Sequence, residues 1–280
     1  MSQTEGRSGG AGPFTTRLTW SPVEGGTAVW ESRVARKRGR LTVRAEGEHE
    51  SRSRIADRVS IRRLRRLNTV AALAFTIGGA LFALGAAVAQ FGSGDATATA
   101  AWIYFAGGLF FNTGGYASLL QAINAPRPEA GAGSLTARAW AWWSYEPGRI
   151  DWLSTFVLFV GTLVFGINLL SSLFQGLSLQ QANRLVWAPD MVGCLLFLIS
   201  GHLALLEVCH GRPGIRARDL GWWIVAINQL GSVLFLISAL AAFTRPATGS
   251  LANETIANWG TLTGALCFSA GGVLQLFERA

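Results

Sequence analysis

The stretch GALCFSAGGVLQLFE, residues 264–278, contains the pattern that decides the fold. Gly264, Phe268 and Gly271 follow one another at steps of four and three residues, so they share one face of a helix. The pattern Gly-x-x-x-Phe-x-x-(Gly/Asn/Ser) occurs once in each of six long apolar segments, and we interpret it as an internal repeat. The other five copies are Gly78-Phe82-Gly85, Gly107-Phe111-Gly114, Gly161-Phe165-Asn168, Gly193-Phe197-Ser200 and Gly231-Phe235-Ser238.

The apolar segments are long enough to cross a membrane. Half of the 280 residues are hydrophobic and 14% are charged, whereas an ordinary soluble domain carries about 25% charged residues. About 20 apolar residues cross a bilayer core as a helix. The sequence therefore predicts an all-α integral membrane protein with six transmembrane helices, at residues 69–91, 101–123, 151–174, 187–208, 222–243 and 257–277.

The arginines predict the orientation of these helices. Residues 1–66 carry 15 of the 24 lysines and arginines, and the loops after the second and fourth segments are also rich in arginine. Positive residues accumulate on the cytoplasmic side of a membrane. We therefore expect both termini in the cytoplasm and the protein in a bacterial inner membrane. A pI of about 10.6 is often found in nucleic-acid-binding proteins. Here the arginines beside the membrane segments account for it, and we do not expect nucleic acid as a partner.

The repeat groups the six segments into three helical hairpins. The second, fourth and sixth segments each carry Gln121, Glu207 or Glu278 fourteen residues after the motif glycine. Each hairpin has two spans, so the three share one orientation, and we expect a pseudo-threefold axis along the membrane normal to relate these parallel repeats. We expect the glycines to let helices approach closely, with a pore lined by these faces as the alternative. The hairpins occupy residues 67–125, 150–210 and 211–280, with a Trp-rich linker at 126–149.

Polar residues inside the segments form the candidate site. Gln121, Glu207 and Glu278 are predicted to face the bundle at the cytoplasmic helix ends, either paired with an arginine or forming a polar ring that gates or binds something. Arginines 212, 216, 218 and 279 and those of 62–66 are the expected partners. No catalytic residue, cofactor or metal site is expected, because no known catalytic or metal-binding spacing is present. The mid-span amides, with interhelical hydrogen bonding as their default role, are the second-choice site: Asn112, Asn168, Asn228 and Gln229.

Residues 1–66 are expected to be a largely irregular, mostly disordered basic arm. Alternation in FTTRLTW, TAVWES and RLTVRAE is compatible with short strands. Residues 53–67 resemble an amphipathic helix on the membrane surface, or they serve only as a topology signal. Asn68 is expected to cap the first span. The arginines expected to meet anionic headgroups are Arg58, Arg62, Arg63, Arg65 and Arg66.

The hairpins resemble one known family. WWIVAINQLGSVLFLISALAAF together with GTLTGALCFSAGGVLQLFE is similar to the YrhK-like group of bacterial membrane proteins, whose unit is a two-helix hairpin with a Gly-x-x-x-Phe-x-x-Gly-Ser pattern. The resemblance covers residues 69–278 and implies a membrane location without an assigned activity. We therefore expect a non-enzymatic membrane scaffold or sensor. The alternative is a small-solute transporter or channel. The sequence identifies no solute or partner, and it leaves a homo-oligomer open.

Overall fold

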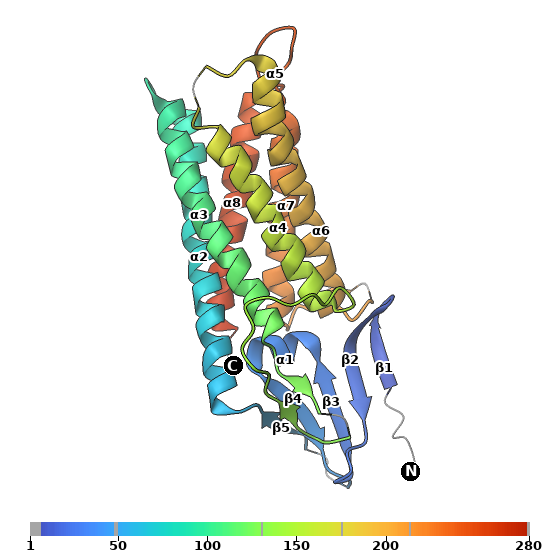
Figure 1. Cartoon of the computed structure of the whole chain (residues 1–280). Helices are drawn as coiled ribbons and strands as arrows, with labels where there is room; N and C mark the ends of the chain where they lie inside the picture. The colour runs from blue at the N-terminus through green and yellow to red at the C-terminus, as the bar shows by residue number, and fades with distance from the viewer. Residues whose placement is uncertain (1–6, 48–49, 130, 175, 213, 279–280) are drawn as a thin grey trace.

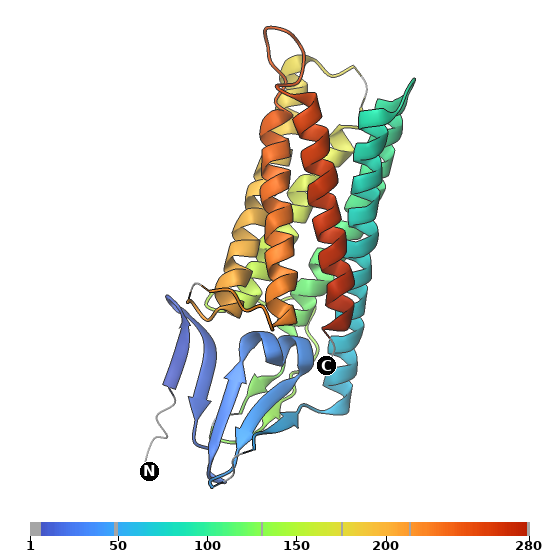
Figure 2. The same cartoon turned by 180° about the vertical axis from the view of Figure 1, so that it is seen from behind.

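A computed structural model describes residues 7–47, 50–129, 131–174, 176–212 and 214–278. Six long helices run side by side and form a closed ring in the order in which they occur along the chain, because the last packs against the first (Figures 1 and 2). The short helices α5 (Leu179–Ala182) and η1 (Asn183–Trp187) extend α6 at its start. The ring consists of α2 (Arg58–Phe91), α3 (Ala96–Ile123), α4 (Ile150–Ser171), α6 (Ala188–Val208), α7 (Leu220–Ala241) and α8 (Glu254–Phe277).

Five of the described helices are long and apolar enough to cross a membrane, as expected for an integral membrane protein: α2, α4, the continuous helix Leu179–Val208, α7 and α8. Their outer faces carry aliphatic side chains such as Leu84, Leu163 and Leu266, which are about half exposed. Apolar side chains outside and glycine inside suit a bundle surrounded by lipid, where burying leucine gains little. The sixth long helix, α3, spans 28 residues between α2 and α4.

The glycine–phenylalanine faces point inward and join the helices in pairs. A Cβ atom on Gly78 of α2 would lie 2.6 Å from the ring of Phe111 on α3, and one on Gly107 of α3 would lie 3.4 Å from Phe82 on α2. The same reciprocal arrangement joins α4 to α6 and α7 to α8, where the glycine–phenylalanine pairs are Gly161–Phe197, Gly193–Phe165, Gly231–Phe268 and Gly264–Phe235. Each glycine therefore makes the room that its partner's ring occupies, which is the packing role expected from the sequence.

The six motif phenylalanines meet in one cluster at the centre of the ring. All six are buried, with exposed fractions between 1% and 7%, and they belong to one hydrophobic core. Phe82 has its ring centroid 5.1 Å from that of Phe111, 5.6 Å from that of Phe165 and 6.3 Å from that of Phe235. Edge-on contacts of this kind are favourable beyond simple burial. The cluster blocks the axis of the bundle at this level, which does not suit a wide pore.

The ring closes through glycines that lie outside the motif. A Cβ on Gly79 of α2 would lie 2.7 Å from the backbone nitrogen of Ser269 and 2.8 Å from the carbonyl oxygen of Ala265, both on α8. In return, a Cβ on Gly272 of α8 would lie 2.7 Å from the backbone nitrogen of Thr76. The obstacles are main-chain atoms, so a side chain at either position forces the two helices apart.

We expect Gly79→Val to lower the free energy of unfolding by at least about 1–3 kcal/mol, because the core is overpacked against backbone. The measurement is the thermal midpoint of the purified protein in detergent. Gly148→Ala is the control, since nothing lies within 4 Å of a Cβ at that position. Equal midpoints for Gly79→Val and the native protein would contradict the closed ring.

The basic arm is not largely irregular, and this expectation was wrong for its described residues. They form a five-stranded antiparallel sheet in the order β1-β2-β3-β4-β5, at one end of the bundle, which we call the sheet end (Figure 1). The three alternating stretches form β2, β3 and β4. The composition, rich in glycine and arginine, predicts disorder, but the fold is held by strand pairing and by contacts with the bundle. The strands are β1 (Arg7–Ala11), β2 (Phe14–Trp20), β3 (Thr27–Glu31), β4 (Arg40–Arg44) and β5 (Arg52–Ile55).

The sheet is joined to the bundle by a short connection. Asp57 follows β5 by two residues and caps α2, its carboxylate accepting hydrogen bonds from the backbone N–H groups of Val59 and Ser60 at 2.9 and 3.0 Å. Residues 58–67 are thus the first turns of α2, and the separate surface helix expected there is absent from this described segment. Asn68 lies inside α2 and is buried, so the expectation that it caps the first span was wrong.

The linker at 126–149 also contacts the sheet. It contains two short paired strands, β6 (Arg127–Pro128) and β7 (Leu135–Thr136). The indole N–H of Trp20 donates to the carbonyl oxygen of Ala132 at 3.0 Å. Glu146 accepts hydrogen bonds from arginines 127, 138 and 149, and bonds from Arg138 and Arg149 outweigh the opposing effect of burial and lower the pKa of Glu146 to about 2.

Candidate functional site

The candidate site is built around a short helix of the sheet domain, α1 (Ser32–Arg38), which connects β3 to β4 and faces the ring of helices. It ends at Gly39, which adopts a left-handed conformation with φ of 57° and donates its N–H to Ala35. Leu64 of α2 lies close to Gly39 and keeps α1 against the bundle. Arg33, Arg36 and Lys37 are spaced by three and four residues, so they share one face of the helix.

Two ion pairs hold α1 in the end of the bundle. Nε and Nη2 of Arg33 each donate to a different carboxylate oxygen of Glu278 at 2.9 Å, in a bidentate arrangement. Arg36 Nη2 donates to Glu207 Oε2, and the hydroxyl of Ser32 donates to Glu207 Oε1, both at 2.9 Å. The Arg36 and Glu207 side chains are 4% and 0% exposed. Burial would raise the pKa of Glu278, but Arg33 and Lys37 outweigh it, and that pKa lies below its usual value.

Lys37 is the third cation on this face of α1 and the single lysine in the chain. Its Nζ donates to Oδ1 of Asn68 at 2.9 Å, and the amide of Gln275 donates to the same oxygen at 3.1 Å. Burial, reinforced by the neighbouring charge of Arg36, lowers the pKa of Lys37 to about 7. Its protonation therefore changes near neutral pH.

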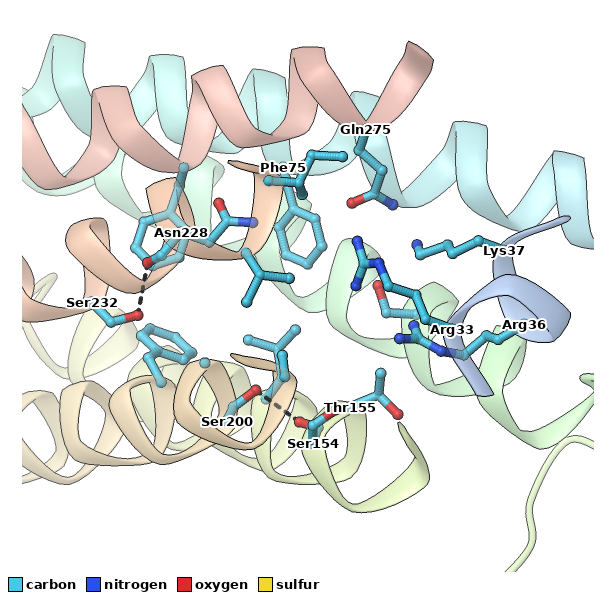
Figure 3. Close-up of a pocket in the computed structure, with 18 residues that line it drawn as sticks. Arg33, Arg36, Lys37, Phe75, Ser154, Thr155, Ser200, Asn228, Ser232 and Gln275 are labelled. Carbon is cyan, nitrogen blue, oxygen red and sulfur yellow. Dashed lines mark hydrogen bonds between the residues drawn. The ribbon is translucent and has the colours of Figure 1, made fainter. Parts of the chain in front are cut away.

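A cavity of about 100 Å³ lies between α1 and the central phenylalanine cluster (Figure 3). Phe197 and Phe268 of that cluster form part of its wall. Arg33, Arg36 and Lys37 line it from the sheet end (Figure 3). The remaining polar lining comes from hydroxyls and amides of five helices: Ser118, Ser154, Thr155, Ser200, Asn228, Ser232 and Gln275.

The three residues that lie fourteen positions after a motif glycine are at the sheet end and are buried, as expected, with exposed fractions of 0% for Gln121, 1% for Glu207 and 4% for Glu278. The described arginines expected as partners were wrong: Glu207 and Glu278 pair with Arg36 and Arg33 of α1, which the folded arm brings to this end of the bundle. Arg279, the remaining expected partner, lies outside the described residues. Gln121 instead donates its amide to the carbonyl oxygen of Leu64 at 3.1 Å.

The mid-span amides do not come together in one site. Asn228 lines the cavity, but Asn112 faces a groove between α3 and α4. Gln229 donates to the carbonyl oxygen of Leu198 on α6 at 3.4 Å. Asn168 is buried in α4 and is not among the residues that line the cavity.

Sequence reasoning missed Ser32, Arg33, Arg36 and Lys37. One signal was available, because a short run with cations at i, i+3 and i+4 separates two stretches that read as strands. The arrangement can bind and orient a ligand through cations, hydroxyls and amides. Comparison of the chain with protein families, curated proteins and solved structures gives no match.

Proposed function

We propose that this chain is a six-span protein of the bacterial cell membrane, built from three related hairpins, with its sheet end in the cytoplasm. The length of α3 and its place between α2 and α4 support a sixth span. The arginine-rich loops and the exposed arginines 58, 62, 63, 65 and 66 at the start of α2 support the orientation. These five side chains are exposed on the side where the proposal places the anionic headgroups. Kinship with the YrhK-like group belongs to the same proposal.

The proposed role is a non-enzymatic sensor or scaffold whose cytoplasmic sheet domain is clamped onto the bundle through α1. The observation that carries this proposal is the buried pairing of Arg36 with Glu207 and of Arg33 with Glu278. Buried ion pairs add little net stability, but removing one partner is costly, so they define one docked position. A partner that binds the released form of the sheet domain better than the docked form shifts the equilibrium between them.

A small-solute transporter is the second candidate, and one observation favours it. The cavity reaches Asn228, well inside α7. The six-ring cluster opposes it, because the cluster fills the axis beyond the cavity. Transport would require those rings to separate, whereas the clamp needs only α1 to move.

The single lysine allows a direct test of the clamp. Endoproteinase Lys-C cuts only after lysine, and Lys37 is 5% exposed in the docked helix. We expect cleavage of the full-length protein in detergent to be at least about 100-fold slower than at an exposed lysine, because cleavage follows the small population of opened molecules. The rate is measured by gel or mass spectrometry.

The matched control moves the lysine to the exposed loop between α6 and α7. In Lys37→Arg/Arg218→Lys, position 218 is exposed, so this variant reports the rate of unhindered cutting. Cleavage of the native protein at the control rate would show that α1 is not docked, and the proposed clamp would have to be abandoned.

A further inference from the structure

The cavity beneath α1 has the charge pattern of an anion site. Each of its charged lining residues, Arg33, Arg36 and Lys37, is a cation, and no described carboxylate lines it. Glu207 and Glu278 instead line a second cleft of about 250 Å³, together with Arg33 and Lys37. The two compartments are therefore separated by Arg33 and Lys37, which line both.

Hydrogen-bond donors at the cavity remain unused. Among the described residues, Nε of Arg36 is buried and has no hydrogen-bond partner. The side chain is only 4% exposed, so solvent around the protein does not take the place of that partner. The ammonium group of Lys37 has three N–H groups and makes one hydrogen bond with the part of the chain that the structure describes, to Asn68. A buried donor without a partner is unfavourable, and more so when it is charged, so the site is suited to an acceptor-rich ligand.

The far wall supplies further donors that are not committed elsewhere. In the part of the chain that the structure describes, the side chains of Ser118 and Asn228 line the cavity and make no hydrogen bond. Figure 3 shows Asn228 across the cavity from the cations of α1. In contrast, the hydroxyls of Ser154, Ser200 and Ser232 already donate to backbone carbonyl oxygens. Donors thus approach the space from two opposite sides.

The size limits the ligand. A cavity of about 150 Å³ in another protein accommodates benzene, so the cavity of about 100 Å³ here has room for a smaller molecule. We propose that this cavity binds a small oxyanion of about four or five non-hydrogen atoms, such as nitrate or a short carboxylate, with the cations of α1 on one side and Asn228 and Ser118 on the other. The site rests on the proposed docking of α1, which supplies all three cations.

The protonation of Lys37 gives the site a pH dependence. Arg33 and Arg36 of α1, Glu207 of α6 and Glu278 after α8 act electrostatically on Lys37, while Asp151 interacts with Arg36 and Asp219 with Arg33. The lysine is charged below its pKa of about 7, so anion binding is strongest there and weakens as the pH rises. A bound anion favours the charged form, so binding at pH 8 takes up protons.

Titration calorimetry of the full-length protein in detergent with sodium nitrate tests the site, with acetate, phosphate and chloride as further arms at matched ionic strength. Asn228→Leu removes the amide and fills the far wall without touching α1. Gln229→Leu is the matched control, since Gln229 is the next residue but lies outside the cavity lining. We expect Asn228→Leu to weaken nitrate binding at least tenfold and Gln229→Leu to leave it unchanged. Proton uptake is measured from the heat in buffers of different ionisation enthalpy.

The outcomes separate the site from the clamp. If Lys37 stays protected from Lys-C and none of the oxyanions binds, the oxyanion site is wrong and the clamp stands. Equal nitrate affinity in the native protein and Asn228→Leu places the anion elsewhere and also overturns the site. Rapid cleavage at Lys37 in the native protein removes both proposals. Chloride bound as tightly as nitrate rejects recognition of an oxyanion.

Discussion

Replacing Glu207 with methionine is expected to release α1 from the bundle. The variant leaves the guanidinium of Arg36 buried without its carboxylate and deprives the Ser32 hydroxyl of its acceptor. Removing one partner of a buried pair costs about 3–5 kcal/mol. Converted to populations, about 3 kcal/mol is roughly a 150-fold change, because each 1.4 kcal/mol is a factor of ten. We therefore expect cleavage at Lys37 by Lys-C to accelerate by at least about 100-fold.

Two further variants isolate the buried pair. In Glu207→Met/Arg36→Met the buried charge is removed along with its partner, and we expect most of the protection to return, since apolar replacement of a whole pair is often neutral. Glu24→Met is the surface control: it breaks the ion pair between Glu24 and Arg54, whose two side chains are 59% and 45% exposed, respectively. This variant should change the free energy of unfolding by less than about 1 kcal/mol. A Glu207→Met protein as resistant to cleavage as the native one would show that this pair does not hold α1.

Truncating Phe82 to alanine should have the second large effect. Phe82 is 1% exposed, and its ring lies against the rings of Phe111, Phe165 and Phe235, one from each hairpin including its own. Loss of a buried phenylalanine ring leaves a cavity and costs about 3–5 kcal/mol. The free energy of unfolding in mixed detergent, followed by tryptophan fluorescence, measures this change.

An outward-facing residue two positions along the same helix provides the comparison. Leu84 is 51% exposed, so Leu84→Ala removes contacts with detergent or lipid and leaves the central cluster intact. We expect this variant to lose less than about 1 kcal/mol, because surface changes away from special features are small. Similar losses for Phe82→Ala and Leu84→Ala would mean that the phenylalanine cluster does not organise the bundle.

The membrane part of the fold could be predicted from local patterns. Lipid requires long apolar helices, and close helix packing requires small residues on the buried face, so the Gly264–Phe268 spacing indicated both the helix and its inner face. The inward position of Gln121, Glu207 and Glu278 followed from the same helical wheel. The relation of the three hairpins by a threefold axis stays a prediction.

The rest depended on contacts between distant parts of the chain. Arg36 and Glu207 are 171 residues apart, and no local pattern connects them. The arm carries few large apolar residues, so its composition suggested disorder. Its fold depends on distant hydrogen bonds instead: the Trp20 indole donates to a carbonyl oxygen of the linker, and the Thr16 hydroxyl is hydrogen-bonded to His210. Asn68 looked like a helix cap because its residue type favours caps, but Asp57 starts the helix eleven residues earlier and leaves Asn68 to bind Lys37.

Closure of the ring through α2 and α8 has a consequence for biosynthesis. Gly79 and its partner Ser269 are separated by 190 residues of chain, which a ribosome adds in about 10–40 s at 5–20 residues per second. Throughout that interval the Gly79 face of α2 lacks the helix that packs against it. Contact between α2 and α8 therefore forms only after α8 has been made. Glu278 follows α8 directly, so the proposed clamp on α1 also forms only after this part of the chain has been translated.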